Sequence, residues 1–246
     1  MSEGSARTPH VGVILAAGAG SRLGELGKRQ SKAMLRLAGR PLIAHVIERL
    51  QAAGIAHLVV VRHVDDAALA AFLAGAQPSA IVGVQHERRG IADALAVAVP
   101  LLGDAPAYLA CACDSLFDPT DIAAVIEAGR DGAAVVGVLA MGAAATATRS
   151  AVLVDGDRVT ALIEKPPPGS VATDLVAAPL YWLPRQLDRY LGAAAQSGAE
   201  RYVTTALAAH LAAGGVVRAV HLHDRIEVTT ADDAVAAEQA LRRPAP

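Results

Sequence analysis

Two glycines and two cations lie close together after a stretch that the sequence predicts to be a buried strand. Residues 11–16 are apolar, include Val and Ile, and end in small residues, which is typical of such a strand. Gly18 and Gly20 come next, and without a Cβ the backbone can turn sharply and bring its N–H groups close to an anion. Arg22 and Lys32 add two positive charges to the same segment. These residue types at this spacing predict a site for a polyphosphate.

Two well-known phosphate-binding motifs do not fit this segment. The dinucleotide-binding fingerprint requires a third glycine at the position of Leu23, and it opens a helix directly. The Walker motif requires a glycine five residues before Gly27, and Arg22 occupies that position. The remaining alternatives are a phosphate site of another kind and a purely structural glycine turn with two surface cations.

The segment from Leu15 to Leu42 resembles the first motif of the nucleotidylyltransferases that join a nucleoside triphosphate to a sugar phosphate. That motif reads Leu-Ala-Ala-Gly-x-Gly-Ser/Thr-Arg-Leu/Met, followed by a lysine and an apolar segment that ends in Gly-x-Pro-Leu. The chain fills these positions, except that Ser31 stands where the family usually has proline before Lys32. The resemblance implies that Arg22 holds the leaving β- and γ-phosphates and that Lys32 balances the charge of the α-phosphate. It also implies nucleotide contacts from Leu15, Ala16, Ala17, Gly18, Gly20 and Ser21.

A glutamine and a glycine follow the predicted strand at residues 81–84. Gln85 and Gly90 alone would fit a polar turn that opens a helix. Placed after a strand, a glutamine followed by the pattern Gly-x-Ala-x-Ala resembles the family's second motif, which implies that Gln85 and Gly90 contact the nucleotide base. A glutamine amide has a donor and an acceptor and so matches the carbonyl and N–H of a pyrimidine, which favours dTTP or UTP.

Asp114 lies just beyond the apolar segment 107–112, which is predicted to be a central strand. Ligands of open α/β sheets bind beyond the carboxyl ends of strands, so this carboxylate is predicted to face the nucleotide. Mg²⁺ commonly binds carboxylate and phosphate oxygens. The family carries an aspartate here that binds magnesium, so the resemblance implies that Asp114 is a metal ligand and a catalytic residue. The alternative is a solvated helix cap, a role for which Asp118 or Asp121 is the better candidate.

The second half of the chain contains a predicted hairpin that ends in Glu-Lys-Pro at residues 164–166. An Asp-Gly pair between two alternating segments is a strong signal for such a turn. The ending resembles a third family motif, in which the glutamate accepts hydrogen bonds from sugar hydroxyls and the lysine pairs with the sugar phosphate. By this resemblance Glu164 and Lys165 bind the acceptor, together with Tyr181 on a predicted strand at 174–183.

Three positions depart from the family pattern near the predicted acceptor site. Glu227 stands where the family has an aspartate that is a second metal ligand, and its extra methylene still allows magnesium binding. Ser150 and Pro179 replace glycines, which usually let a substrate approach the backbone closely. The sequence therefore predicts that the transfer chemistry is retained, whereas the acceptor is not plain glucose 1-phosphate in the usual pose.

Composition limits the classes of protein that fit. The length of 246 residues predicts one α/β domain at residues 11–246, after a disordered leader at residues 1–10. A net charge of -2 gives no general attraction to nucleic acid or to an anionic membrane. No apolar segment approaches the ~20 residues that span a bilayer, and the absence of export signals predicts a cytoplasmic protein. Cys111 and Cys113 are too close for ordinary disulfide geometry and too few for a zinc site, so they are predicted to be small buried residues.

The order of predicted strands and helices, together with the resemblance, implies a three-layer α/β/α sandwich with a mixed, mostly parallel sheet. This is the Rossmann-like fold of the nucleotide-diphospho-sugar transferases. The implied reaction joins a nucleoside triphosphate to a sugar or cyclitol phosphate with Mg²⁺ and releases pyrophosphate. A cytidylyl- or guanylyltransferase that acts on a non-sugar phosphate is one alternative, and a non-catalytic nucleotide-sugar-binding protein is another. The oligomeric state stays open, with a homo-oligomer among the alternatives.

Overall fold

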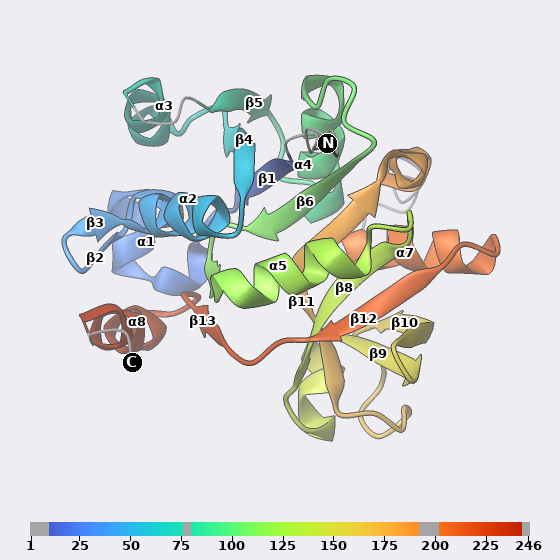
Figure 1. Cartoon of the computed structure of the whole chain (residues 1–246). Helices are drawn as coiled ribbons and strands as arrows, with labels where there is room; N and C mark the ends of the chain where they lie inside the picture. The colour runs from blue at the N-terminus through green and yellow to red at the C-terminus, as the bar shows by residue number, and fades with distance from the viewer. Residues whose placement is uncertain (1–9, 76–79, 192–201, 243–246) are drawn as a thin grey trace, which may run out of the picture.

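The computed structural model describes residues 10–75, 80–191 and 202–242 of the chain. Residues 1–9 of the predicted leader lie outside this described part, whereas His10 is the first residue of strand β1 (His10–Ala16). The described part folds around one nine-stranded sheet with helices on both of its faces (Figure 1). This architecture confirms the predicted three-layer α/β fold.

The main sheet is mixed, and two of its nine strands run antiparallel to the other seven. Besides β1, its strands are β4 (Ile55–His63), β5 (Ile81–Gln85), β6 (Ala107–Ala112), β8 (Ala134–Ala140), β9 (Ser150–Asp155), β10 (Arg158–Glu164), β11 (Leu175–Pro184) and β12 (Val217–His221). Their order is β5-β4-β1-β6-β11-β8-β12-β10-β9. Pairing is parallel from β5 to β6 and between β8 and β12, whereas β11 and β10 are antiparallel to both of their neighbours. The predicted mixed, mostly parallel sheet is confirmed.

Each face of the sheet has its own apolar core, because alternate residues of a strand point to opposite sides. The helices are α1 (Glu25–Arg29), α2 (Leu42–Ala52), α3 (Ala67–Ala74), α4 (Ile91–Ala98), α5 (Pro119–Ala128), α6 (Asp188–Leu191), α7 (Val203–Ala212) and α8 (Ala231–Arg242). Ile14 and Leu109 belong to one core, to which α2, α3, α5 and α8 contribute. Val13 and Tyr108 belong to the other, to which α4, α6 and α7 contribute. The sheet is therefore buried on both sides.

A short pairing outside the main sheet carries the C-terminal segment back to the end of β6. Strand β7 (Ser115–Phe117) pairs antiparallel with β13 (Arg225–Glu227), which places Glu227 opposite Ser115. Just before β13, the buried Asp121 accepts a hydrogen bond from the His223 backbone N–H at 3.0 Å, and its other oxygen lies 2.6 Å from Nδ1 of that ring. Asp121 therefore fixes the approach to β13.

Of the two predicted caps, the side chain of Asp118 caps α5 by accepting a hydrogen bond from Thr120 N at 2.8 Å. Strands β2 (Arg36–Leu37) and β3 (Arg40–Pro41) pair antiparallel as a small hairpin, which precedes α2.

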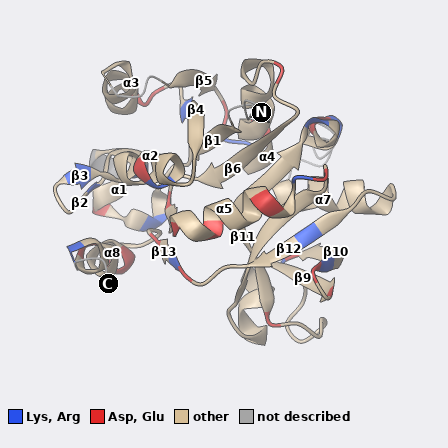
Figure 2. Ribbon diagram, viewed as in Figure 1, with Lys and Arg blue, Asp and Glu red and all other residues tan. Residues whose placement is uncertain are grey.

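The cysteines and the charged residues can be compared with the expectations from composition. Cys111 and Cys113 are buried and unbonded, as predicted, and burial raises the pKa of Cys111 to about 12. Acidic and basic residues are interspersed along the ribbon, in keeping with the net charge of -2 (Figure 2). No helix in the described residues is long and apolar enough to cross a membrane.

Gly129 ends helix α5 directly against the indole of Trp182. A Cβ at Gly129 would lie 2.0 Å from Trp182 Cδ1, although its backbone φ of -97° suits any residue. We expect Gly129→Ala to lower the free energy of unfolding by about 1–3 kcal/mol, the usual cost of overpacking, measured by urea denaturation. Gly75→Ala is the matched control, because Gly75 ends α3 at φ -103° and the nearest atom, the Phe72 carbonyl oxygen, would lie 3.9 Å away. Equal losses in the two variants would contradict this packing.

Candidate active site

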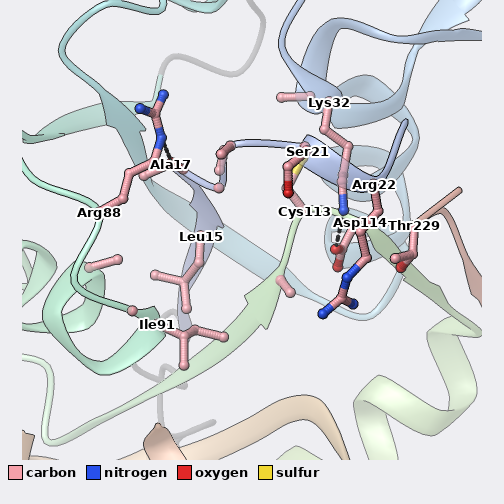
Figure 3. A pocket seen from close by; sticks show the side chains of 18 of the residues that line it. Leu15, Ala17, Ser21, Arg22, Lys32, Arg88, Ile91, Cys113, Asp114 and Thr229 are labelled. Carbon is pink, nitrogen blue, oxygen red and sulfur yellow. Dashed lines mark hydrogen bonds and ion pairs between the residues drawn. The ribbon is translucent and has the colours of Figure 1, made fainter. Parts of the chain in front are cut away.

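A cavity of about 510 Å³ opens at the carboxyl ends of β1 and β6 (Figure 3). This volume is in the range of sites for small-molecule ligands. The cavity lies between the loop after β1, the turn that opens α4, the end of β6 and the segment after β13. Its lining includes every residue that the sequence predicted to be catalytic or to bind the nucleotide, namely Leu15, Ala16, Ala17, Gly18, Gly20, Ser21, Arg22, Lys32, Gln85, Gly90 and Asp114.

The glycine loop after β1 is shaped by its own backbone and by two supports. Gly20 has a φ of 63°, a left-handed conformation that glycine adopts without strain. A Cβ on Gly27 would lie 2.5 Å from the Gly20 carbonyl oxygen, so α1 contacts the loop backbone directly. On the other side, Arg88 Nε donates a hydrogen bond to the Ala17 carbonyl oxygen at 3.2 Å. Sequence analysis did not assign Gly27 or Arg88 to the site, because these contacts are made only in the folded chain.

Lys32 and Asp114 form an ion pair inside the cavity. Lys32 Nζ lies 2.7 Å from Asp114 Oδ2, and the two side chains are only 16% and 28% exposed. Lys32 opens a turn of 3-10 helix at Lys32–Met34, and Asp114 follows β6. Arg22 extends into the same space beside the pair (Figure 3). The structure thus brings two cations and one carboxylate together next to the backbone of the glycine loop.

Gln85 is held in one orientation by an acidic neighbour. Its side chain is buried, and Nε2 donates a hydrogen bond to Asp93 Oδ2 at 2.8 Å. Asp93 also lies 3.3 Å from Arg89 Nε. Nε2 also donates to the Gly90 carbonyl oxygen at 3.5 Å, so the carbonyl oxygen is the group that Gln85 can offer to a ligand in the cavity. Asp93 was not predicted as a site residue, although its place in the Gly-x-Ala-x-Ala pattern was visible in the sequence.

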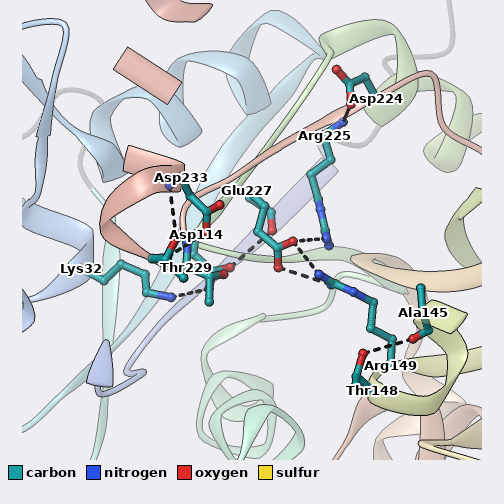
Figure 4. A network of polar contacts seen from close by, with 12 residues as sticks. Lys32, Asp114, Ala145, Thr148, Arg149, Asp224, Arg225, Glu227, Thr229 and Asp233 are labelled. Carbon is teal, nitrogen blue, oxygen red and sulfur yellow. Dashed lines mark hydrogen bonds and ion pairs between the residues drawn. The ribbon is translucent and has the colours of Figure 1, made fainter. Parts of the chain in front are cut away.

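Glu227 lies between two arginines (Figure 4). Arg149 Nη2 lies 2.8 Å from Glu227 Oε2 and Nη1 lies 3.3 Å from Oε1, and Arg225 Nη2 lies 2.5 Å from Oε2. Burial opposes ionisation of Glu227, but the hydrogen bond from Arg149 and the charges of both guanidinium groups outweigh it and lower its pKa. The side chain of Arg225 is only 3% exposed, and burial lowers the pKa of this guanidinium. Glu227 is therefore a fully paired anion.

This pairing bears on the predicted metal site. Among the described residues no three His, Cys, Asp or Glu side chains are grouped as metal ligands. Asp114 fits magnesium, since one carboxylate together with phosphate oxygens is a common ligand set. Both oxygens of Glu227 accept hydrogen bonds from the guanidinium groups, so a metal ion at the predicted second position would compete with the arginines for this carboxylate. The assignment of Asp114 and Glu227 to a metal stays a prediction.

The predicted acceptor residues lie together but do not line the cavity. Glu164 Oε2 accepts hydrogen bonds from the hydroxyls of Ser150 and Thr204. Lys165 has a φ of 42°, and its Nζ lies 4.7 Å from the ring centroid of Tyr202. Tyr181 is buried, and burial followed by the nearby charge of Glu164 raises its pKa. Their assignment to acceptor binding stays a prediction.

Comparison with known proteins places this geometry in a family. Residues 12–216 match the MobA-like NTP transferase domain. The chain belongs to this family. The match confirms the resemblance to nucleotidyltransferases that the motifs indicated.

Individual relatives show how far the likeness extends. The chain is 30% identical over 238 residues to the bifunctional protein GlmU of Dinoroseobacter shibae, covering 94% of this chain and 52% of that protein. It thus spans about half the length of this curated relative. The fold matches UDP-glucose pyrophosphorylase from Acinetobacter baumannii with a TM-score of 0.81 at 19% identity, covering 95% of this chain and 93% of that one. It also matches the inositol-1-phosphate CTP transferase from T. maritima with a TM-score of 0.79 at 17% identity, covering 97% and 98%.

The pairing of Glu227 predicts how the stability of the chain depends on this carboxylate. We expect Glu227→Gln to lower the free energy of unfolding at pH 7 by about 1–3 kcal/mol, because charged donors lose their anionic partner. The pKa of Glu227 is lower in the folded chain than the ~4.3 of a free glutamate. The stabilisation that ionised Glu227 provides is therefore complete above a pH of ~4.3 and is lost as the pH falls through the folded pKa.

Urea denaturation of the parent chain and of Glu227→Gln between pH 3 and pH 7 measures the difference in the free energy of unfolding. Glu127→Gln serves as the control, since Glu127 is 60% exposed in its ion pair with Arg130, and we expect an effect within about 0.5 kcal/mol. A Glu227→Gln effect as small as that of the control would show that the arginines do not depend on this carboxylate.

Proposed function

We propose that this chain transfers a nucleotidyl group from a nucleoside triphosphate to a phosphate-type oxygen of an acceptor. In this reaction an acceptor oxygen forms a bond to the α-phosphorus, the bond between the α- and β-phosphates breaks, and pyrophosphate leaves with the bonding electrons. The observation that carries the proposal is the Lys32–Asp114 pair beside Arg22 and the glycine loop in one cavity. Membership of the NTP transferase family supports the same reaction.

The chain's own residues account for most of the work that such a transfer requires. Positioning and neutralisation of charge determine the rate, since the protein forms no covalent bond to the substrate. Arg22 would bind the β- and γ-phosphates, and Lys32 would stabilise charge on the α-phosphate. Asp114 would hold Mg²⁺, which when bound supplies Lewis-acid character and helps to orient the phosphates. The Lys32–Asp114 pair keeps both side chains in place before the nucleotide arrives.

The acceptor is proposed from the relatives and from the third motif. The names of two structural neighbours refer to glucose and to inositol 1-phosphate, and these support a sugar or cyclitol phosphate as the acceptor. Glu164, Lys165 and Tyr181 are the candidates to bind it. A cytidylyl- or guanylyltransferase for a non-sugar phosphate is the second candidate, and the hydroxyls that already occupy Glu164 favour it. A non-catalytic binding protein would not need Arg22, Lys32 and Asp114 in one cavity.

Two further parts of the proposal concern the setting of the protein. A cytoplasmic location stays a prediction from the sequence, as does the absence of nucleic acid and membrane partners, and the oligomeric state stays open with a homo-oligomer among the alternatives.

Lys32→Ala tests the central residue of the proposal. We expect kcat for pyrophosphate release to fall by about 10²-fold or more, as on removal of a donor to the transition state. Arg22→Ala should lower kcat to a similar degree. Arg130→Gln is the control, because Arg130 lies in an exposed ion pair with Glu127 far along the chain from these motifs. Near-normal turnover in correctly folded Lys32→Ala would remove Lys32 from the mechanism.

Asp93→Asn tests the nucleotide preference. In the parent chain Gln85 offers an acceptor oxygen, which suits the N3–H of uracil or thymine and not the unprotonated N3 of cytosine. An asparagine at position 93 can donate or accept, so it no longer fixes the Gln85 amide. We expect the ratio of the dissociation constants for CTP and UTP to fall about tenfold, which corresponds to ~1.4 kcal/mol. Calorimetric titration measures both constants, with Asp104→Asn as the control; an unchanged ratio would contradict the role of Asp93.

The reaction class itself is tested with purified protein, Mg²⁺ and a grid of five nucleoside triphosphates against sugar and cyclitol phosphates. We expect acceptor-dependent pyrophosphate release that stops on addition of EDTA, because EDTA removes the cation that Asp114 would hold against the phosphate oxygens. Release that is unaffected by EDTA would exclude a magnesium role for Asp114.

A further inference from the structure

The acceptor end of the site carries a net positive charge beside the candidate magnesium ligand. Arg149 and Arg225, here called the arginine pair, share a single carboxylate, that of Glu227. The three groups therefore carry a net charge of about +1 with Glu227 ionised. Glu227 lines the cavity, and the N–H of Val228 donates a hydrogen bond to the Asp114 carbonyl oxygen at 2.9 Å. This excess charge thus lies next to the candidate magnesium ligand.

The arginine pair lies beside the other predicted acceptor cation. The Lys165 backbone N–H donates a hydrogen bond to the Arg149 carbonyl oxygen at 3.2 Å, which joins the Glu-Lys-Pro segment to the pair. Arg149 uses two N–H groups on Glu227, whereas a guanidinium has five. Its side chain is 31% exposed, so it can reach a ligand. A planar guanidinium fork matches the oxygens of a phosphoryl group.

A second, independent observation concerns the place where a sugar hydroxyl would bind. Oε2 of Glu164 already accepts hydrogen bonds from two hydroxyls of the chain, Thr204 Oγ1 at 2.9 Å and Ser150 Oγ. The same two hydroxyls lie 3.0 Å from each other. A sugar hydroxyl would have to displace one of them from Oε2 or bind Oε1 alone. The chain itself therefore satisfies one of the two carboxylate oxygens that a polyhydroxylated substrate would otherwise use.

We propose that the acceptor is a short-chain phosphate or phosphonate with few hydroxyls, and that Arg149 of the arginine pair binds its phosphoryl group while the buried Arg225 holds Glu227. This inference rests on the proposed nucleotidyl transfer and names its substrate class. One phosphoryl oxygen of the acceptor forms a P–O bond to the α-phosphorus, the α–β bridging bond breaks, and pyrophosphate leaves. A phosphate monoester is mostly the dianion at neutral pH, with its second pKa near ~6, so the attacking oxygen has no proton to lose. Glu227 is a positioning residue that keeps the two guanidinium groups side by side.

The first experiment compares acceptors. Pyrophosphate release is measured with Mg²⁺ and the triphosphate that binds most tightly, using propyl phosphate, propylphosphonate, glucose 1-phosphate and inositol 1-phosphate. We expect kcat/KM at least about tenfold higher for a short-chain probe than for either polyhydroxylated one, the size of effect that one displaced hydrogen bond would produce. The comparison of propyl phosphate with propylphosphonate decides whether the acceptor is a phosphate or a phosphonate. Preference for a polyhydroxylated acceptor, or no turnover of either short-chain probe, overturns the inference.

Triphosphate binding is followed by calorimetry in the same preparations. A chain that binds no triphosphate refutes the proposed function as well. A chain that binds triphosphate and prefers glucose 1-phosphate or inositol 1-phosphate refutes only the inference about the acceptor.

The second experiment replaces Arg149, because its side chain is partly exposed whereas that of Arg225 is buried. We expect Arg149→Gln to raise KM for the short-chain probe by about 10-fold or more while KM for the triphosphate changes less than about twofold, since a charged hydrogen bond to phosphoryl is worth ~1.5–3 kcal/mol. Arg149→Lys should restore part of the loss. Arg130→Gln is the matched control for loss of an arginine. Equal changes in both KM values would show that Arg149 acts only through the fold, and this would overturn its assignment.

The third experiment frees the carboxylate of Glu164. Ser150→Gly removes one of the two hydroxyls on Oε2 and restores the space of a glycine. We expect kcat/KM for glucose 1-phosphate to rise by about 5-fold or more relative to that for the short-chain probe, as expected for a hydrogen bond worth ~1 kcal/mol. A proportional loss with every acceptor would contradict the proposed discrimination.

Discussion

The ion pair between Lys32 and Asp114 is the contact on which the arrangement of the site depends. It joins a turn after the glycine loop to the end of β6, and the two strands that lead to it are neighbours in the sheet. The backbone N–H of Cys113 donates a hydrogen bond to the Leu15 carbonyl oxygen at 3.0 Å, so the ladder between β1 and β6 continues to the residue before Asp114. The position of Asp114 relative to the loop is therefore set by the sheet and not by a flexible segment.

Strand pairing also positions the C-terminal part of the site. Strand β13 reaches Asp114 only because it pairs with β7, which directly follows Asp114. The buried Asp121 fixes the turn that enters this pairing. One edge of the sheet thus collects residues from the start, the middle and the end of the chain, as is expected for ligand sites in α/β folds.

Electrostatics divides the site into two regions. In the first, Lys32 and Asp114 are paired with each other beside Arg22 and the backbone of the glycine loop. In the second, Glu227 is shared by Arg149 and Arg225, so positive charge is left over. No aromatic side chain is among the described residues that line the cavity, so this lining offers charged and hydrogen-bonding groups and no stacking surface.

The sequence by itself determined the fold class, the succession of strands along the chain up to the hairpin, and the residues that meet in the cavity. It could do so because glycines, small residues and single charges within about thirty residues of each other specify local backbone shape directly. Asp114 was also predicted, because a carboxylate just after a central strand has a known position in α/β folds.

Only the tertiary structure decided which groups Glu227, Asp93 and Glu164 contact. The sequence predicts Glu227 as a magnesium ligand, and the fold adds that its charge is balanced by Arg149, far away in the chain, and by Arg225. The sequence predicts that Glu164 accepts hydrogen bonds from a substrate, and the fold adds that Ser150 and Thr204 donate to one of its oxygens. A side chain's role depends on which donors and charges surround it after folding, and those partners come from segments whose separation along the chain carries no signal of contact.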